Sequence, residues 1–116
     1  MTAETAKLPL TVAVIALNAE AQIGELLASV GFAGEVLVVD SGSTDATADV
    51  AAAHGARVIR KEWLGFGRQK QFAVSEASHD WVLCLDVDER VTPRLAQSIR
   101  RAIADPRFKA GRMARR

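Results

Sequence analysis

The chain has 116 residues, a mass of 12.4 kDa and a formal net charge of +1, and hydrophobic residues make up 49% of it. This length suffices for one small domain, and the apolar content excludes a disordered chain. No apolar run reaches the ~20 residues that cross a bilayer, and the N-terminus lacks a signal-peptide pattern, so we expect a cytoplasmic protein.

The first half of the chain predicts two strand–helix pairs. The apolar, β-branched run at 10–17 is typical of a strand that is buried on both faces. A second buried strand is predicted at 35–40, and the polar turn 41–45 is expected to cap an alanine-rich helix that ends near His54. The helix between the two strands is predicted from apolar residues at helical spacing: Ile23, Leu26, Leu27 and Val30.

The second half repeats the pattern. A short strand is predicted at 57–60, a helix at 68–77 and a strand at 81–86. Thr92 and Pro93 have the residue types of an N-cap and of a first helical position. The buried face of that last helix is expected to be Leu95, Ile99, Ala102 and Ile103. Strands that alternate with helices predict an α/β fold with a mostly parallel sheet.

The single cysteine, Cys84, lies in the predicted strand 81–86. It has no partner within the chain for a disulfide bond. Because a free cysteine packs as a small hydrophobic residue, we expect Cys84 to be a buried structural thiol.

Polar residues follow three of the predicted strands. Because parallel strands end at one edge of a sheet, and ligands bind at that edge, these residues are candidates for a site. The Asp-x-Asp spacing at 86–88 allows two carboxylates to share Mg²⁺ or Mn²⁺. Four acidic groups are expected to converge there, and a cation or hydrogen-bond donors would neutralise them: Asp40, Asp86, Asp88 and Glu89. Asp45, by contrast, is expected to be a helix cap or a solvated turn residue.

Motifs that would indicate other nucleotide or phosphate chemistry are absent. The chain contains neither the Gly-x-Gly-x-x-Gly of dinucleotide-binding folds nor a P-loop. Phosphatases with an aspartate nucleophile carry Asp-x-Asp-x-Thr/Val, and the chain has Arg90 at the fifth position.

Three segments together resemble family 2 glycosyltransferases of the GT-A fold: 12–18, 35–47 and 81–91. The segment 63–73, Trp-Leu-Gly-Phe-Gly-Arg-Gln-Lys-Gln-Phe-Ala, is similar to a narrower bacterial branch that adds glucose to the inner core of lipopolysaccharide. The resemblance implies a Rossmann-like nucleotide-diphospho-sugar transferase fold. It divides the chain into a flexible N-terminus at 1–9, a nucleotide-sugar-binding part at 10–106 and a basic C-terminal end at 107–116.

The resemblance also implies a role for each candidate site residue. Asp40 should accept a hydrogen bond from the nucleobase, expected to be uracil, and Asn18 should border that base. Asp86 should face the ribose and the metal shell, and Asp88 should ligate the Mg²⁺ or Mn²⁺ that bridges the diphosphate. Lys70 stands where a basic residue often approaches the nucleotide. The resemblance gives no role to Glu89.

The implied reaction transfers a sugar, with inversion, from a nucleotide-sugar donor that we expect to be a UDP-sugar. The implied acceptor is a lipopolysaccharide-core or other cell-envelope saccharide, free or lipid-linked, and no nucleic acid is involved.

The chain departs from the family pattern in three respects. Gln71 stands where many members have Asn. Many members carry an aromatic residue before the Asn, where it stacks on the base, and this chain has Leu17 there. Inverting members carry the catalytic base well after the metal triplet, so we expect it beyond Arg116. The chain is therefore interpreted as an N-terminal portion that is inactive by itself.

The basic end has two interpretations. Residues 90–116 carry 9 basic and one acidic side chain, whereas residues 1–89 carry 6 basic and 13 acidic ones. We expect a domain that continues, but the charge also suits lipid phosphates at the cytoplasmic face of the inner membrane. The alternative to a transferase is a non-catalytic nucleotide-binding or interaction module with a basic C-terminal contact.

Overall fold

The structure, a computed structural model, describes residues 7–105 and, for the backbone, 113–115. Most of the segment 1–9, predicted to be flexible, therefore lies outside the described residues. The same is true of 106–112 and 116 in the basic end.

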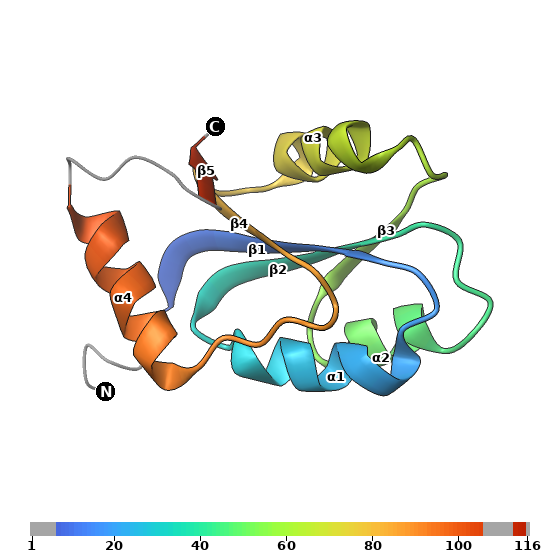
Figure 1. Cartoon of the computed structure of the whole chain (residues 1–116), viewed down its shortest axis with the longest axis horizontal. Helices are drawn as coiled ribbons and strands as arrows, with labels where there is room; N and C mark the ends of the chain where they lie inside the picture. Colours follow the sequence, from blue (N-terminus) through green and yellow to red (C-terminus); the bar gives the residue numbers. More distant parts are fainter. Residues whose placement is uncertain (1–6, 106–112, 116) are drawn as a thin grey trace.

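A five-stranded sheet in the order β3-β2-β1-β4-β5 forms the centre of the molecule (Figure 1). Four strands are parallel, and β5 runs antiparallel to β4 with Met113 opposite Leu83. The predicted α/β fold with a mostly parallel sheet is thus confirmed. The strands are β1 (Leu8–Ala16), β2 (Ala33–Asp40), β3 (Arg57–Arg60), β4 (Trp81–Leu85) and β5 (Met113–Arg115).

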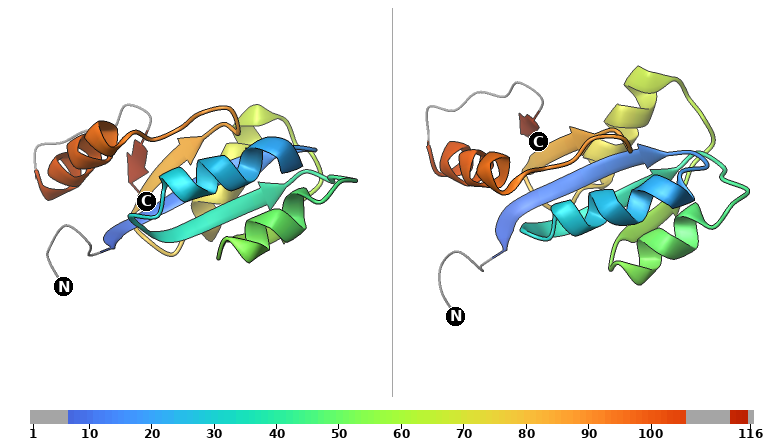
Figure 2. Two further views of the ribbon diagram at one scale, coloured as in Figure 1. Left: turned by 90° about the horizontal axis from the view of Figure 1, so that it is seen from below. Right: turned by 60° about the horizontal axis from the view of Figure 1, so that its bottom comes forward.

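The described part of the chain contains four helices: α1 (Glu20–Ser29), α2 (Thr47–Ala53), α3 (Phe66–Glu76) and α4 (Pro93–Ala104). The helices α1 and α2 lie side by side on one face, and α3 covers the other (Figures 1 and 2). Among the described residues, no helix is both long and apolar enough to cross a membrane.

Alternate residues of β1 and β2 enter two separate cores. Val12, Val14 and Val38 pack with α1, whereas Ala13 and Leu37 pack with α3. Because successive side chains of a strand point to opposite faces, a central strand covered on both sides must be apolar throughout. This explains why the two runs could be recognised as buried strands.

Some predicted boundaries need correction. β1 begins at Leu8, two residues earlier than predicted, and β4 ends at Leu85. Helix α3 begins at Phe66 because Gly65, with φ of +97°, occupies its N-cap. A side chain at Gly65 would be strained in that conformation.

The predicted buried face of α4 is only partly correct. Thr92 caps the helix as predicted, since its Oγ1 accepts a hydrogen bond from the Leu95 N–H at 3.1 Å. Ile99 is buried, but the side chain of Leu95 is 45% exposed. Ala96, the next residue in the first turn, packs against the core with Ile99 and Ile103, so the buried face of α4 lies one position away from Leu95.

Glu35 connects three strands and the loop before β4. Its carboxylate accepts hydrogen bonds from the Thr11 hydroxyl at 2.9 Å, and from the N–H and hydroxyl of Ser78 at 2.9 and 2.8 Å. Arg57 Nε lies 3.2 Å away on β3. Partial burial raises the pKa of Glu35, but the bonds from Ser78 and Thr11 and the charge of Arg57 outweigh it and lower the pKa below its ordinary value.

The substitution Glu35→Gln is expected to lower the free energy of unfolding at pH 7 by about 1–2 kcal/mol, because charge-assisted hydrogen bonds are lost. A carboxylate whose pKa is lowered by folding stabilises the protein above its unfolded pKa and loses that effect as the pH falls through the folded value. The deficit should therefore shrink in denaturant titrations carried out below about pH 4, the range in which an ordinary Glu titrates. Glu76→Gln, an exposed position at the end of α3, is the control. A deficit that stays constant at every pH would contradict this assignment.

Candidate functional site

The loops after β1 and β2 are joined by hydrogen bonds from side chains to the backbone. The Asn18 N–H donates to Ser43 Oγ at 2.8 Å, and the Thr44 N–H donates to Asn18 Oδ1 at 2.8 Å. The Ala19 N–H donates to Thr47 Oγ1, also at 2.8 Å. Asn18 has φ of +48°, a left-handed conformation that Asn tolerates better than most residues. These hydrogen bonds, made by the side chains of Asn18, Ser43 and Thr47, fix the two loops relative to each other.

Asp45 does not cap α2 in the expected position. The N-cap residue is Ala46, which makes no side-chain bond, and Asp45 instead accepts from the Thr47 N–H at 2.9 Å and the Glu20 N–H at 3.3 Å. The pKa of Asp45 is lowered, chiefly by the hydrogen bond from the Thr47 hydroxyl. Its role as a structural turn residue is correct, but it ties α2 to the start of α1 as well.

Asp40, the last residue of β2, is completely buried. Its Oδ1 accepts three hydrogen bonds, from the Gly42 N–H at 3.2 Å, the Ser43 N–H at 2.9 Å and the Ser43 hydroxyl at 2.7 Å. Its Oδ2 has no hydrogen-bond partner, and Arg60 Nε lies 3.9 Å away, too far for a hydrogen bond. Because an unpaired buried acceptor costs about 1–3 kcal/mol, the position favours a ligand that offers an N–H donor.

A tight turn after β4 carries the Asp-x-Asp pair. Glu89 closes it, since Glu89 Oε1 accepts from the Asp86 N–H at 2.8 Å and the Glu89 N–H donates to the Asp86 carbonyl at 3.0 Å. This gives Glu89 a structural role that the sequence did not reveal. The side chains of Asp86 and Asp88 are exposed.

Arg90 anchors this turn to α1. Its Nη1 donates to the Val87 carbonyl at 2.7 Å, and its Nη2 donates to the Gln22 carbonyl at 3.2 Å. Glu25 lies 3.6 Å from the same guanidinium. Glu89 therefore closes the turn and Arg90 attaches it to α1, while the side chains of Asp86 and Asp88 remain exposed.

The four acidic groups lie at or after the ends of strands that meet one edge of the sheet, but they do not form a single metal-binding cluster. Asp40 is bonded within its own turn, and Glu89 is bonded to the backbone at Asp86. Within residues 7–105, no group of three or more His, Cys, Asp or Glu side chains is arranged to hold a metal ion. Two exposed carboxylates, Asp86 and Asp88, remain as a donor set, and oxygen donors of this kind suit Mg²⁺ or Mn²⁺ when phosphate and water complete the shell.

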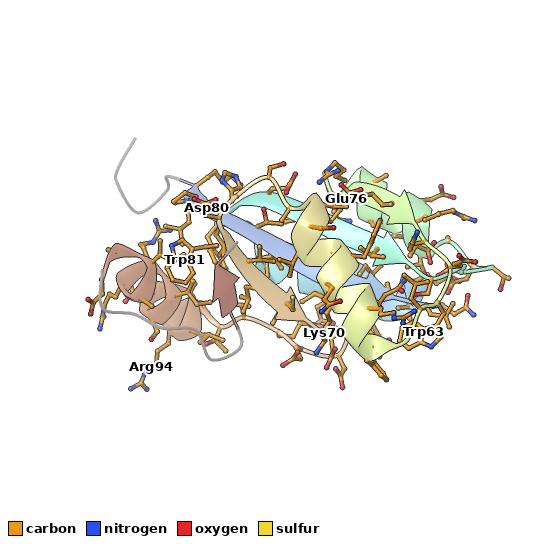
Figure 3. The ribbon with its side chains drawn as sticks, turned by 90° about the horizontal axis from the view of Figure 1, so that it is seen from above. Trp63, Lys70, Glu76, Asp80, Trp81 and Arg94 are labelled. Carbon is orange, nitrogen blue, oxygen red and sulfur yellow. The ribbon has the colours of Figure 1, made fainter. Side chains whose placement is uncertain are left out.

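Lys70 lies on α3 beside the carboxyl end of β4 (Figure 3). Both Lys70 and Asp86 act electrostatically on the Cys84 thiol. Burial is the largest influence and raises the pKa of that thiol; Lys70 lowers it and Asp86 raises it further. Cys84 is half-buried rather than fully buried, because α3, the helix on this face of the sheet, packs mainly on β1 and β2.

A groove of about 460 Å³ opens at the same edge of the sheet, lined by Ile15, Ala16, Leu17, Ser41, Trp63 and Phe66. Gln69, a completely buried residue of α3, supports one wall of this groove. Its Oε1 accepts from the Leu64 N–H at 3.0 Å, and its Nε2 donates to the Lys61 carbonyl at 3.3 Å and to Ser41 Oγ at 3.4 Å. Sequence reasoning missed Gln69, although it precedes the buried Ala73 by one helical turn.

The five candidate residues thus lie at one edge of the sheet, in two groups. Asn18 and Asp40 are linked through Ser43. Asp86 and Asp88 share the turn after β4, and Lys70 lies beside that strand.

Comparisons with known proteins agree on one family. The sequence profile of Glycosyl transferase family 2 matches residues 11–115. The lipopolysaccharide core biosynthesis glycosyltransferase LpsC of Rhizobium meliloti is 36% identical over 103 residues, which is 84% of this chain and 38% of LpsC.

Two solved structures are similar. Mannosyl-3-phosphoglycerate synthase from Rubrobacter xylanophilus matches with a TM-score of 0.71 and 26% identity, over 84% of this chain and 36% of that one. Glucosyl-3-phosphoglycerate synthase from Mycobacterium tuberculosis, in complex with Mn²⁺, UDP and glucosyl-3-phosphoglycerate, matches with a TM-score of 0.59 and 33% identity, over 67% of this chain and 33% of that one. The chain therefore spans little more than a third of the length of these relatives.

The substitution Gln69→Leu is expected to lower the free energy of unfolding by about 1–3 kcal/mol, because it leaves the Leu64 N–H and the Lys61 carbonyl without their partner. Gln71→Leu, two residues away on the exposed side of α3, is the matched control and should change stability by less than about 0.5 kcal/mol. Urea denaturation followed by circular dichroism measures both. Equal stability of the two variants would show that Gln69 does not support the loop.

Proposed function

Because the chain belongs to glycosyl transferase family 2, we propose that it forms the donor-binding part of an enzyme that transfers a sugar from a nucleoside-diphosphate donor. Its parallel sheet and alternating helices are the GT-A fold of its structural relatives. The observation that carries the proposal is the buried Asp40 with one unpaired oxygen, at the edge of the sheet that also carries two exposed aspartates.

In this proposal Asp40 binds the nucleobase, and uracil is the base that fits. Because Oδ1 already accepts from three donors, Oδ2 is the oxygen that lacks a hydrogen-bond donor, and it suits a base with a single N–H on its pairing edge. The imide of uracil offers one N–H between two carbonyls. The complex of UDP with the mycobacterial relative supports this choice. Asn18 would border the same base, since it is tied to the Asp40 turn.

Asp86 and Asp88 would hold a divalent cation, and Asp86 would also face the ribose. When bound, the cation would supply positive charge against the charge that develops on the departing diphosphate. The chain's own contribution is to hold the two carboxylates in a turn closed by Glu89 and anchored by Arg90, with Lys70 nearby on α3 as a second positive charge. The relative that contains Mn²⁺ supports this assignment.

We further propose that the acceptor is a saccharide of the lipopolysaccharide core or another cell-envelope saccharide, on the strength of the similarity to LpsC. Acceptor binding and the base for an inverting transfer are assigned to the portion of the relatives that this chain does not cover. The exposed Arg94, Leu95 and Arg101 of α4 would allow a peripheral contact with anionic lipid on the cytoplasmic face of the inner membrane.

The 116-residue chain is expected to bind UDP more tightly when Mn²⁺ or Mg²⁺ is present, as measured by isothermal titration calorimetry. Asp88→Ala should reduce the affinity in the presence of metal by at least about tenfold, the lower limit of what the loss of a metal-site residue costs. Affinity without metal should hardly change. Asp49→Ala, an exposed position on α2, is the control. Absence of UDP binding by the unaltered chain would contradict the proposal and favour a non-catalytic interaction module.

The substitution Asp40→Asn is expected to reduce the affinity for uridine by about tenfold or more, because one charge-assisted hydrogen bond is lost. The loss should be the same with and without metal, in contrast to that of Asp88→Ala. Thermal denaturation monitors the fold, and the amide oxygen of Asn can still accept the bonds from Ser43. Unchanged uridine affinity in a folded variant would show that Asp40 does not contact the base.

A further inference from the structure

Three of the four large hydrophobic side chains that are exposed within residues 7–105 line one groove. Leu17 is 56% exposed, Trp63 is 50% exposed and Phe66 is 70% exposed, and all three border the groove at the carboxyl edge of the sheet. Exposed apolar side chains gathered in a concave site indicate a ligand more strongly than scattered ones do.

The two aromatic rings form an edge-to-face pair. The centroids of the rings of Trp63 and Phe66 are 5.0 Å apart, and their planes make an angle of 89°. In this arrangement the edge of one ring meets the face of the other, and both residues remain at least half exposed. Such pairs are favourable by themselves and hold the rings in a defined orientation.

The loop that carries the aromatic pair is fixed before any ligand arrives. The amide of Gln69 binds the Leu64 N–H and the Lys61 carbonyl on either side of Trp63. Gly65 turns the chain between the two aromatic residues, with φ of +97° and ψ of 157°, a conformation open essentially to glycine alone. A rigid wall of this kind loses little conformational entropy when a ligand binds.

The position of the groove identifies the kind of ligand. Ser41 lines the groove and directly follows Asp40, whose Oδ2 is the buried acceptor without a partner. A ligand that suits both features has a flat apolar face and one N–H donor, and a pyrimidine base has both. An alkyl chain would cover the aromatic rings but would leave the carboxylate oxygen unpaired.

We propose that Trp63, oriented by Phe66, provides the aromatic surface on which the nucleobase of the donor stacks. The inference rests on the proposed nucleotide-sugar site. It adds Trp63 and Phe66 to that site, as residues that determine the affinity for the base. Many members of the family have an aromatic residue at the position of Leu17. The proposal explains how this chain could stack the base without an aromatic residue there. In this chain the aromatic surface comes from the loop before α3 and faces the same groove as Leu17.

Fluorescence and calorimetry test the proposal together. The chain has two tryptophans, and Trp81 lies on β4 at the end of the molecule opposite Trp63 (Figure 3). In Trp81→Phe, uridine should change the fluorescence of Trp63, the tryptophan that remains. In Trp63→Phe, the fluorescence of Trp81 should not respond to uridine.

Trp63→Leu keeps an apolar side chain but removes the ring. Its affinity for uridine and for UDP should fall by the same factor, about 5- to 100-fold, which is the range measured for the loss of one base–aromatic stack. Trp63→Phe should stay within about threefold of the unaltered chain, because it keeps a ring. Binding of pyrophosphate with Mn²⁺ should not change in either variant. Leu95→Ala, an exposed apolar residue on α4, is the control.

The outcomes separate the two proposals. If the unaltered chain does not bind UDP, the nucleotide-sugar function itself fails. If it binds UDP and Trp63→Leu binds uridine equally well, the function stands and the stacking role of Trp63 is refuted. An equal loss of uridine and pyrophosphate affinity in Trp63→Leu would also refute it, since that result indicates a general disturbance of the site.

Discussion

The carboxylate of Asp40 is the interaction on which the carboxyl edge of the sheet depends. One of its oxygens collects three hydrogen bonds from the turn that follows β2. Ser43, which supplies two of them, also accepts the backbone N–H of Asn18 and so brings in the loop after β1. The same group that organises two loops keeps its second oxygen buried and unpaired. The side chain of Asp40 therefore serves both the fold and the proposed binding. Its unpaired buried oxygen lowers the stability of the protein, and a ligand that donates a hydrogen bond to it would restore that stability.

Much of the fold follows from local patterns in the sequence. Uninterrupted β-branched runs identified the two central strands, and strict alternation of strand and helix identified the parallel sheet. Thr92 with Pro93 placed the start of α4 correctly, because capping depends on residues that are neighbours in the chain. The antiparallel β5 was not predicted, since its pairing with β4 joins segments about thirty residues apart and leaves no periodic signal in three residues.

The sequence predicts where the candidate site lies, at the edge where the strands end, but not the geometry of its side chains. The positions of Asn18, Asp40, Asp86 and Asp88 after strands place them at one edge by topology alone. Which carboxylates face one another depends on side-chain partners, so Glu89 was expected near a cation and instead bonds to the backbone of its own turn. Gln69 lies in a run of polar residues, and its burial arises from contacts with the loop before α3 and with Ser41, just after β2, that the sequence does not reveal. Leu17 follows β1 in place of an aromatic residue, yet the groove still has aromatic walls, because Trp63 and Phe66 border it.

The edge strand β3 has a consequence for solubility. It is four residues long, pairs with β2 on one side, and carries Arg57 and Arg60 at its two ends. Both side chains are exposed, and Arg57 is also engaged by Glu35. A sheet edge that is short and bears charge at both ends is a poor template for pairing with another molecule, so it protects the protein against edge-to-edge aggregation. Arg57 and Arg60 thus pair with carboxylates of β2 and also hinder the pairing of this edge with a strand of another molecule.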